Sequence, residues 1–150
     1  MFAMQPVAKT DLVYCLRILE AIGKINLYAE GYDDPFVFFD ANDQKDFNAC
    51  LLQLLHIGEQ VNRISESTKY MAPQIPWPMI KGFRNLIAHD YVGIDKFIVF
   101  DTITGSLPNL KYHIEKLVRD GLVTGVFALT DYNLSKESNF YRHINFFSIL

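Results

Sequence analysis

The segment Pro78–Tyr91, with the sequence PMIKGFRNLIAHDY, combines a clear helical pattern with the densest group of reactive side chains in this chain. Its apolar residues Ile80, Phe83 and Ile87 recur at i, i+3 and i+7, which is the spacing of one buried helix face. A proline is well tolerated in the first turn of a helix, where its missing N–H is not needed. The segment is therefore predicted to be an amphipathic helix that begins at about residue 78.

The polar flank of this predicted helix carries Arg84, Asn85 and His89, and Tyr91 follows directly after it. Asn85 and His89 are four residues apart, so they share one face about one turn apart. Arginine is a permanent cation suited to phosphate, and histidine exchanges protons near neutral pH. Such side chains can support cleavage of a phosphodiester bond. Taken alone, however, an Arg and a His near a helix end are more often an ion-pair donor and a capping residue.

Two long helices are predicted ahead of this segment. The first has an apolar period from Leu12 onward and a candidate N-cap at Thr10. The second is expected over about residues 43–66, where Gly58 lowers helix propensity and is best explained by close packing of a neighbour. The residues between them are rich in Asp, Pro and aromatic side chains and predict a loop. The apolar run Phe36–Phe39 in this loop must be covered by the core or by a partner chain.

A further helix is predicted after the motif segment, with Asp95 as its N-cap. Gly105 and Pro108 should break or kink it, after which the apolar period resumes up to Gly121. Because the connections between these amphipathic helices are short, the sequence favours an antiparallel bundle of four to five helices. The predicted fold class is all-α.

The residues from 122 to 150 depart from this helical pattern. Residues 122–129 have the β-branched and aromatic content of a short strand, residues 131–133 indicate a turn, and residues 140–150 are aromatic-rich with a possible helical period. The apolar end must either fold back on the bundle or lie in an interface. The chain is therefore divided into a helical domain, residues 1–121, and an atypical C-terminal extension of uncertain structure.

Composition sets limits on the class of protein. With 150 residues, of which 50% are hydrophobic and 21% charged, the chain matches one ordinary globular domain. A formal net charge of −3 is not typical of a nucleic-acid-binding protein, whose surface is usually basic. The segment Val61–Lys96 differs, with five basic residues against three acidic ones. Dimerisation would double this surplus around a shared cleft and would suit weak contact with a few phosphates.

Other features of the sequence argue against a metal site and against a membrane-spanning helix. Cys15 and Cys50 each lie on an apolar helical stripe, which favours reduced, buried thiols over a disulfide or a metal ligand. No apolar run reaches the length of about 18 residues that a membrane span requires. Residues 1–8 lack the charged and apolar regions of a signal peptide. A cytoplasmic location without membrane attachment is therefore expected.

Several short motifs between residues 57 and 108 occur together in a particular order. They are Ile57-Gly58-Glu59, Ile75-Pro76-Trp77, Gly82-Phe83-Arg84-Asn85, His89-Asp90-Tyr91, Ile94-Asp95 and Leu107-Pro108. In this set the chain resembles the HepT family of HEPN-domain ribonuclease toxins, over roughly residues 8–120. The most specific part of the resemblance is an Arg, four residues, a His, one residue and a Tyr, which here are Arg84, His89 and Tyr91.

The resemblance implies a small all-helical homodimer in which the Arg84 and His89 residues of two chains face one cleft. Such a dimer is expected to cleave RNA without a metal or other cofactor. The resemblance also implies a partner, an MNT-type minimal nucleotidyltransferase antitoxin, which would silence the toxin by attaching AMP to Tyr91. RNA and this antitoxin are the expected binding partners.

Roles for the site residues follow from the chemistry of RNA, whose 2′-OH can attack the adjacent phosphate. His89 is the expected acid and base, Arg84 the stabiliser of the charged phosphorane, and Asn85 a hydrogen-bonding positioner. His56 and Glu59 could line the cleft, although a His-Glu pair of this spacing is more often structural. Two alternatives stay open. The chain could be a non-catalytic HEPN-like dimer that binds a nucleotide or a partner protein, or it could be an interaction scaffold.

Overall fold

The computed structural model of the protein describes residues 7–150, with side chains from Asp11 onward. This part of the chain contains helices and no β-strand, so the all-α prediction is confirmed. The elements are α1 Val7–Tyr28, α2 Pro35–Arg63, α3 Glu66–Tyr70, α4 Trp77–His89, α5 Lys96–Asp101, the π-helical segment η1 Thr102–Ser106, α6 Leu107–Thr124, α7 Leu129–Lys136 and α8 Phe146–Ile149.

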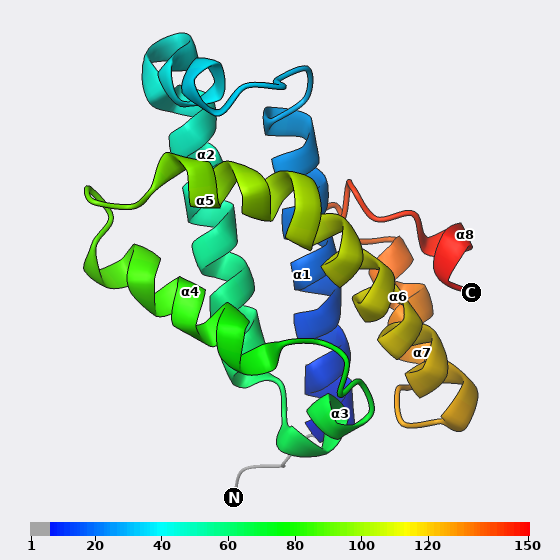
Figure 1. Ribbon diagram of the computed structural model, residues 1–150. Coiled ribbons are helices and arrows are strands. Elements are labelled where there is room, and N and C mark those ends of the chain that lie inside the picture. Colours follow the sequence, from blue (N-terminus) through cyan, green and yellow to red (C-terminus); the bar gives the residue numbers. More distant parts are fainter. Residues whose placement is uncertain (1–6) are drawn as a thin grey trace, which may run out of the picture.

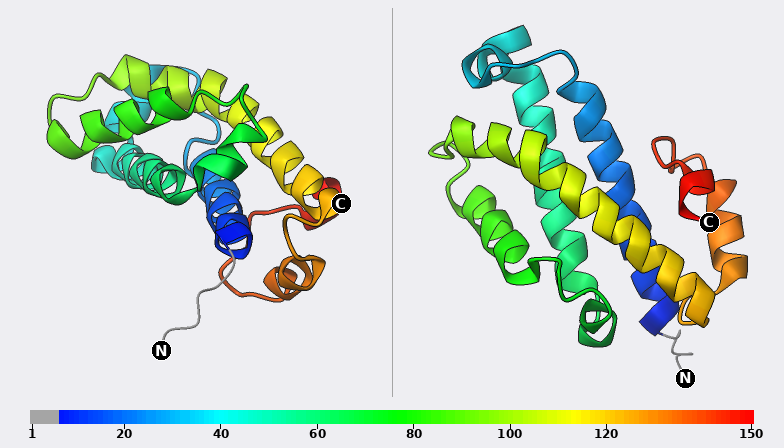
Figure 2. Two further views of the ribbon diagram at one scale, coloured as in Figure 1. Left: turned by 90° about the horizontal axis from the view of Figure 1, so that it is seen from below. Right: turned by 45° about the vertical axis from the view of Figure 1, so that its right-hand side comes forward.

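The long helices pack as an antiparallel bundle around α1, as predicted (Figure 1). Helix α1 lies between α2 and α6, and α4 packs on the other side of α2. The segments α5, η1 and α6 follow one another as a single long rod that crosses α2 and α1 (Figure 2). The core is filled mainly by aliphatic side chains, and its fully buried aliphatic members include Leu12, Leu16, Ile18, Ile22, Ile25, Leu51, Ile87 and Ile114. Its largest fully buried side chains are Tyr132, Phe38 and Phe127.

Helix α1 begins at Val7, so Thr10 lies inside the helix and the predicted N-cap is wrong. The next residue, Asp11, is buried and holds the start of α3 instead. Its carboxylate accepts hydrogen bonds from the Ser65 backbone N–H at 3.1 Å, from the Ser65 hydroxyl at 2.5 Å and from the Thr68 hydroxyl at 2.6 Å. This buried polar cluster fastens α3 to α1.

The loop predicted between the first two helices is largely wrong, because α2 already begins at Pro35. The Asp34 side chain caps this helix by accepting from the N–H groups of the following turn, and Pro35 occupies its first position. The helix is then interrupted at Asn42–Gln44, three residues with φ between 52° and 64°. The short helix before this kink buries Phe38 in the core, whereas Phe36 and Val37 of the same apolar run are 50% and 58% exposed.

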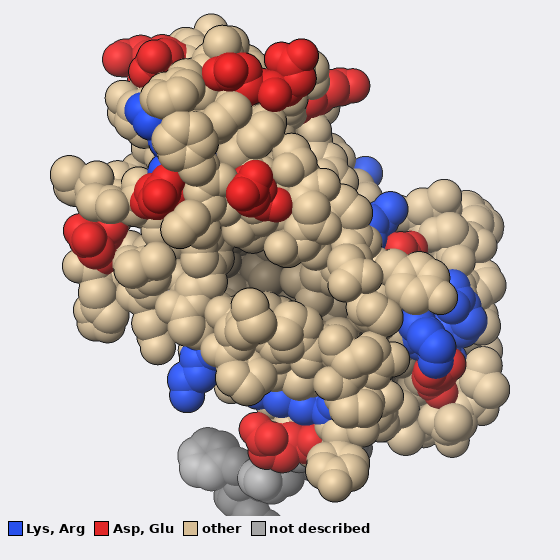
Figure 3. All heavy atoms as spheres, viewed as in Figure 1, with Lys and Arg blue, Asp and Glu red and all other residues tan. Residues whose placement is uncertain are grey.

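The end of the molecule formed by this kink is acidic. The segment Asp33–Asp46 carries five aspartates against one lysine. Figure 3 shows acidic side chains gathered at this end, at the top of the view.

The predicted break at Gly105 and Pro108 takes the form of η1, a π-helical segment over Thr102–Ser106. The backbone continues through it into α6 without a loop, and Pro108, which has no N–H to donate to the preceding turn, lies just past the π-helical segment. Helix α6 also passes the predicted end at Gly121. It is closed by Gly125, whose φ of 80° requires glycine.

The strand predicted over residues 122–129 is wrong, since this stretch is the end of α6 and the connection leading into α7, and the turn predicted at residues 131–133 is wrong, since α7 covers Leu129–Lys136. Short apolar segments read alike as strand or helix, and contact with the bundle decides between them. The extension folds back on the bundle, one of the two expected outcomes. The Tyr132 hydroxyl donates to the Phe146 carbonyl at 2.6 Å, and Arg119 Nε of α6 donates to the Ile149 carbonyl at 2.7 Å. The division of the chain near residue 121 stays a prediction.

Both cysteines are free and buried, as predicted. Burial raises the pKa of the Cys15 thiol, and it raises the pKa of Cys50 to about 12. Among residues 7–150, no helix has the length and apolar character needed to cross a membrane. No group of three or more His, Cys, Asp or Glu side chains in the same part of the chain is arranged to hold a metal ion.

Candidate functional site

The candidate site begins where α4 packs against α2. A Cβ atom placed on Gly58 of α2 would overlap Cβ and Cγ of Arg84, so only glycine lets the arginine stem lie this close. The close packing predicted for Gly58 is therefore confirmed. Ile87, on the buried face of α4, is almost fully enclosed in the core, which fixes the rotation of the helix and turns its polar flank outward.

Arg84 is held by two polar neighbours. Its Nε donates to Glu59 Oε1 at 2.6 Å, and its Nη2 contacts the same oxygen. Its Nη1 donates to the side-chain oxygen of Asn85 at 3.0 Å. The side chains of Arg84 and Glu59 are 27% and 36% exposed, so the pair is reachable from solvent. The guanidinium is thus fixed in orientation and still open to a ligand.

His89 is the last residue of α4 and is exposed. It makes no side-chain hydrogen bond to any residue in the described part of the chain. It follows Arg84 by five residues, which corresponds to about 7.5 Å along the helix axis. The structure therefore brings Glu59, Arg84 and Asn85 into contact and places His89 at the end of the same helix.

Tyr91 lies in the turn between α4 and α5. Its hydroxyl donates to the side-chain oxygen of Asn48 on α2 at 2.5 Å, and its side chain is 48% exposed. The turn itself is held by the Asp90 carboxylate, which accepts from the Gly93 N–H at 3.1 Å. Tyr91 is thereby anchored at its hydroxyl without being buried.

A groove of about 570 Å³ opens beside Tyr91, between α2 and the start of α5. Phe39 and Phe97 contribute aromatic rings to its lining, and Asn48 contributes an amide. The ammonium group of Lys96 lies 4.4 Å from the Phe39 ring centroid, a distance typical of a cation–π contact. The sequence did not predict that Asn48 would line this groove or that Lys96 would contact the Phe39 ring. The apolar run Phe36–Phe39 was the available signal for the groove.

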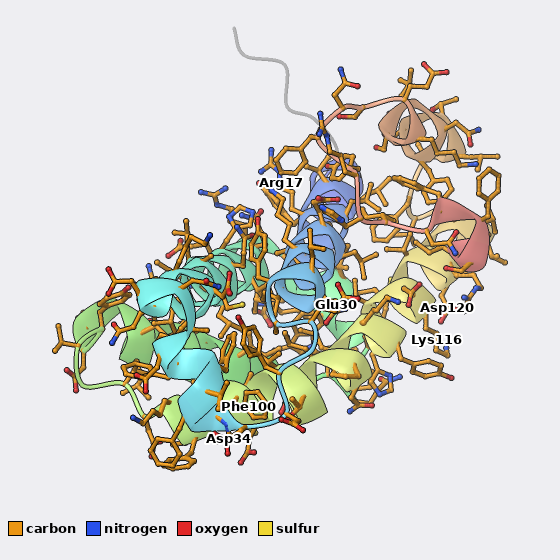
Figure 4. The ribbon with its side chains drawn as sticks, turned by 90° about the horizontal axis from the view of Figure 1, so that it is seen from above. Arg17, Glu30, Asp34, Phe100, Lys116 and Asp120 are labelled. Atoms are coloured by element: carbon orange, nitrogen blue, oxygen red, sulfur yellow. The ribbon has the colours of Figure 1, made fainter. Side chains whose placement is uncertain are left out.

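His56 and Glu59 do not act together as a pair. Glu59 turns toward Arg84, whereas His56 lines a different groove with Arg17 and Lys24 of α1. Figure 4 shows Arg17 beside α1 on the side away from α6. Burial lowers the pKa of His56 below its usual value, and the positive charges of Arg17, Lys24 and Arg63 lower it further. Glu59 opposes this shift only weakly, since its contribution is the last in order of size.

Comparison with known proteins shows which family this chain resembles. A family model described as "Ribonuclease HepT-like" matches residues 18–117, two thirds of the chain. A candidate RNase of Methanocaldococcus jannaschii, MJ0125, is 33% identical over 64 residues, which cover 43% of this chain and 55% of that protein. A second candidate RNase of that organism, MJ0127, is 32% identical over 78 residues, covering 52% of this chain and 64% of that protein.

A probable ribonuclease HepT of Thermococcus cleftensis is 33% identical over 75 residues, covering 50% of this chain and 68% of that protein. The matched region thus spans between about half and two thirds of these relatives. No solved structure matches the chain. Because the family model matches two thirds of the chain and this part includes the whole of α4, the chain belongs to the HepT-like ribonuclease family.

Proposed function

We propose that this protein is a metal-independent endoribonuclease toxin whose site contains Arg84 and His89. The observation that carries the proposal is the set of contacts that hold the Arg84 side chain. Its guanidinium is fixed by Glu59 and Asn85, remains partly exposed, and stands on the same helix as the exposed His89. An oriented cation and a nearby imidazole are the groups that phosphodiester cleavage by internal attack requires. Family membership supports the same reaction.

In the proposed reaction, His89 takes the proton of the ribose 2′-OH, and the 2′ oxygen forms a bond to the adjacent phosphorus. The bond from phosphorus to the 5′ oxygen then breaks, and the leaving oxygen takes a proton from a second histidine. The products are a 2′,3′-cyclic phosphate and a 5′-OH end. Arg84 binds the negative oxygens of the phosphorane, and Asn85 offers a hydrogen bond that positions the phosphate.

The scheme needs a base and an acid, and the motif supplies one histidine per chain. A homodimer that faces two α4 helices toward one cleft would supply the second. The outer surface of this region supports such contact, because Met79, Leu86 and Val92 are large apolar residues exposed beside the motif. A second copy would cover them and complete the site.

The proposal is tested by incubating labelled RNA with the purified protein in the presence of a chelator. His89→Ala and Arg84→Ala are each expected to reduce the cleavage rate by about 100-fold or more, since each removes a group with an effect of that size. Lys111→Ala is the control, because Lys111 lies on α6 and pairs with Glu115. Full activity in both site variants would refute the assignment. Absence of cleavage by dimeric wild type would favour the non-catalytic alternative, a dimer that binds a nucleotide or partner.

Silencing by an MNT-type nucleotidyltransferase antitoxin forms the second part of the proposal. The Tyr91 oxygen would attack the α-phosphate of ATP, forming a phosphodiester to AMP and releasing pyrophosphate and the phenolic proton. The exposed side chain supports this, and the adjoining groove has aromatic rings and Lys96 to receive the nucleotide. Tyr91→Phe should cleave RNA normally and gain no AMP mass when incubated with antitoxin and ATP. AMP found on Tyr91→Phe would place the modification elsewhere.

A further inference from the structure

A second groove, of about 260 Å³, lies between α1, α2 and the C-terminal extension. Arg17 and Lys24 of α1 line it, together with His56 of α2 and the ring of Phe140. Phe140 follows the last residue of the family match, residue 117, so this groove depends on a part of the chain that the family model does not include. None of the motif residues of α4 contributes to it.

The groove is positively charged. Two of its lining residues, Arg17 and Lys24, make no ion pair with any carboxylate in the described part of the chain. Arg63 does not line the groove, but it follows His56 by seven residues on α2, about 10.5 Å of helix rise, and its charge helps those of Arg17 and Lys24 to lower the pKa of His56. The cations of α6 behave differently, since Lys111 and Lys116 each pair with a carboxylate four residues later. Unpaired cations gathered at one place in a chain of net charge −3 indicate an anionic ligand.

One carboxylate, that of Glu20, also borders the groove, but it faces the protein interior. Its side chain is 1% exposed, and Oε1 accepts from the His143 backbone N–H at 2.8 Å. Its other oxygen, Oε2, lies 3.9 Å from Nε2 of the same histidine. Glu20 therefore holds the extension in place, and the charges presented to solvent are the positive ones.

His56 adds a hydrogen-bond donor to this lining. Its Nδ1 lies 3.5 Å from Nε2 of Gln60, an amide nitrogen that can only donate. In the neutral imidazole that the lowered pKa favours, Nδ1 accepts this bond, and Nε2 then carries the proton. That N–H is left for a ligand such as a phosphate oxygen.

The Phe140 ring offers a stacking surface at one end. It is 49% exposed, and the Lys24 ammonium lies 5.4 Å from its centroid. Proteins that hold single-stranded nucleic acid combine a cationic groove for the backbone with aromatic rings on which bases stack. Both components are present here.

We propose that this groove binds the backbone of single-stranded RNA, with Arg17 and Lys24 contacting phosphates inside it, Arg63 contacting a phosphate farther along α2, and one base stacking on Phe140. The identification of RNA as the ligand of this groove rests on the proposed ribonuclease function. The groove also lies close to the candidate site along α2, because His56 precedes Glu59 by three residues, about 4.5 Å of helix rise. A strand that passes Arg84 can continue into the groove.

The test measures binding of a fluorescein-labelled single-stranded RNA by fluorescence anisotropy over a series of NaCl concentrations. Every ribose carries a 2′-O-methyl group, so the strand cannot be cleaved and binding is measured independently of catalysis. Two double variants are compared with wild type: Arg17→Gln/Lys24→Gln and Lys24→Gln/Arg63→Gln. The second spares Arg17, which bonds to Tyr141 of the extension. The control is Lys111→Gln/Lys116→Gln, which removes two paired cations.

Both groove variants are expected to raise Kd by about tenfold or more and to reduce the salt slope by about 1.4, since each phosphate contact on a single strand contributes about 0.7. The control should bind as wild type does. Groove variants that bind like the control would overturn the inference, and so would wild type that binds no RNA. If only Arg17→Gln/Lys24→Gln loses RNA affinity, and its melting temperature also falls, Arg17 has a structural role and the inference is overturned. If a free mononucleotide displaces the RNA completely, the ligand of the groove is a small nucleotide and not an RNA strand.

This experiment separates the two proposals. If the ribonuclease function is wrong, the dimeric wild type cleaves no RNA in the chelator assay, while binding of the uncleavable strand is still measured independently. If only the groove is wrong, the chelator assay succeeds and the groove variants bind normally.

Discussion

At the scale of single residues, the position of Arg84 depends on a glycine in the neighbouring helix. Gly58 leaves the space in which the arginine stem lies, and Glu59, the next residue, binds its guanidinium. One short stretch of α2 therefore provides both the room and the counter-charge for Arg84. The roles of Arg84, Asn85, His89 and Glu59 in catalysis stay predictions until variants are assayed.

Gly58→Ala should destabilise the protein and reduce RNA cleavage. Alanine favours a helix by about 1 kcal/mol over glycine, but overpacking against the Arg84 stem costs about 1–3 kcal/mol and displaces the guanidinium. Gly82→Ala is the matched control, because a Cβ at Gly82 of α4 meets open space. It should raise stability by about 1 kcal/mol. Denaturant unfolding of both variants checks this, and a stabilised Gly58→Ala would contradict the packing argument.

His56 gives the stability of the protein a defined pH dependence. Its pKa in the folded protein lies below the unperturbed value of 6.5, so between these two values the unfolded chain binds more protons. The contribution of His56 to stability is thus intact above pH 6.5 and declines as the pH falls through that value. Thermal melting from pH 8 to pH 5 should show wild type losing more stability than His56→Gln. Parallel curves would contradict the shift.

At the scale of elements, apolar periodicity predicted α1, most of α2, α4 and α6, because each of these helices buries one long stripe. It failed at the start of α2, where the Asp34 carboxylate accepts from the N–H groups of Phe36 and Val37, and this N-cap outweighs a loop-like composition. It failed again after residue 121, where contacts with α1 and α6 determine the structure. The motif residues were visible in sequence because they share one helix. Asn48 was not, since only the packing of α2 against the turn brings it to Tyr91.

The kink in α2 stores backbone strain that glycine would relieve. Gln44 adopts φ 64°, a left-handed conformation that costs about 1–2 kcal/mol for a residue with a Cβ. Glycine would avoid this cost, but it loses about 0.5–1 kcal/mol more conformational entropy on folding. Gln44→Gly should therefore stabilise the protein by about 0.5–1 kcal/mol. Gln53→Gly, in the regular part of the same helix, should destabilise it by about 1 kcal/mol. Equal changes in melting temperature for both variants would argue against a strained kink.

At the scale of the whole molecule, the C-terminal extension is part of the packed structure. Phe146 is buried against the bundle, whereas its neighbour Phe147 is 87% exposed. Gly23 of α1 leaves the space that His143 occupies, so the extension also lies directly on α1. The bundle and the extension thus share buried surface, and a change in the extension is felt by the fold.

Phe146→Ala should destabilise the protein by about 3–5 kcal/mol, the usual cost of removing a buried phenyl ring. Phe147→Ala removes an identical ring from solvent and should change stability by no more than about 0.5 kcal/mol. Chemical denaturation of the two variants makes the comparison. Similar midpoints for both would mean that the extension does not pack on the bundle in solution.

The acidic end formed by Asp33–Asp46 has a consequence for the kinetics of encounter. It stands at one end of α2, while Arg63 stands at the other end and Arg17 and Lys24 lie along α1. The protein therefore carries an electric dipole moment despite its small net charge. A diffusing polyanion is repelled from the aspartate end and is turned toward the cationic side before any contact forms. The association rate constant should fall steeply with ionic strength, even though the molecule as a whole is negative.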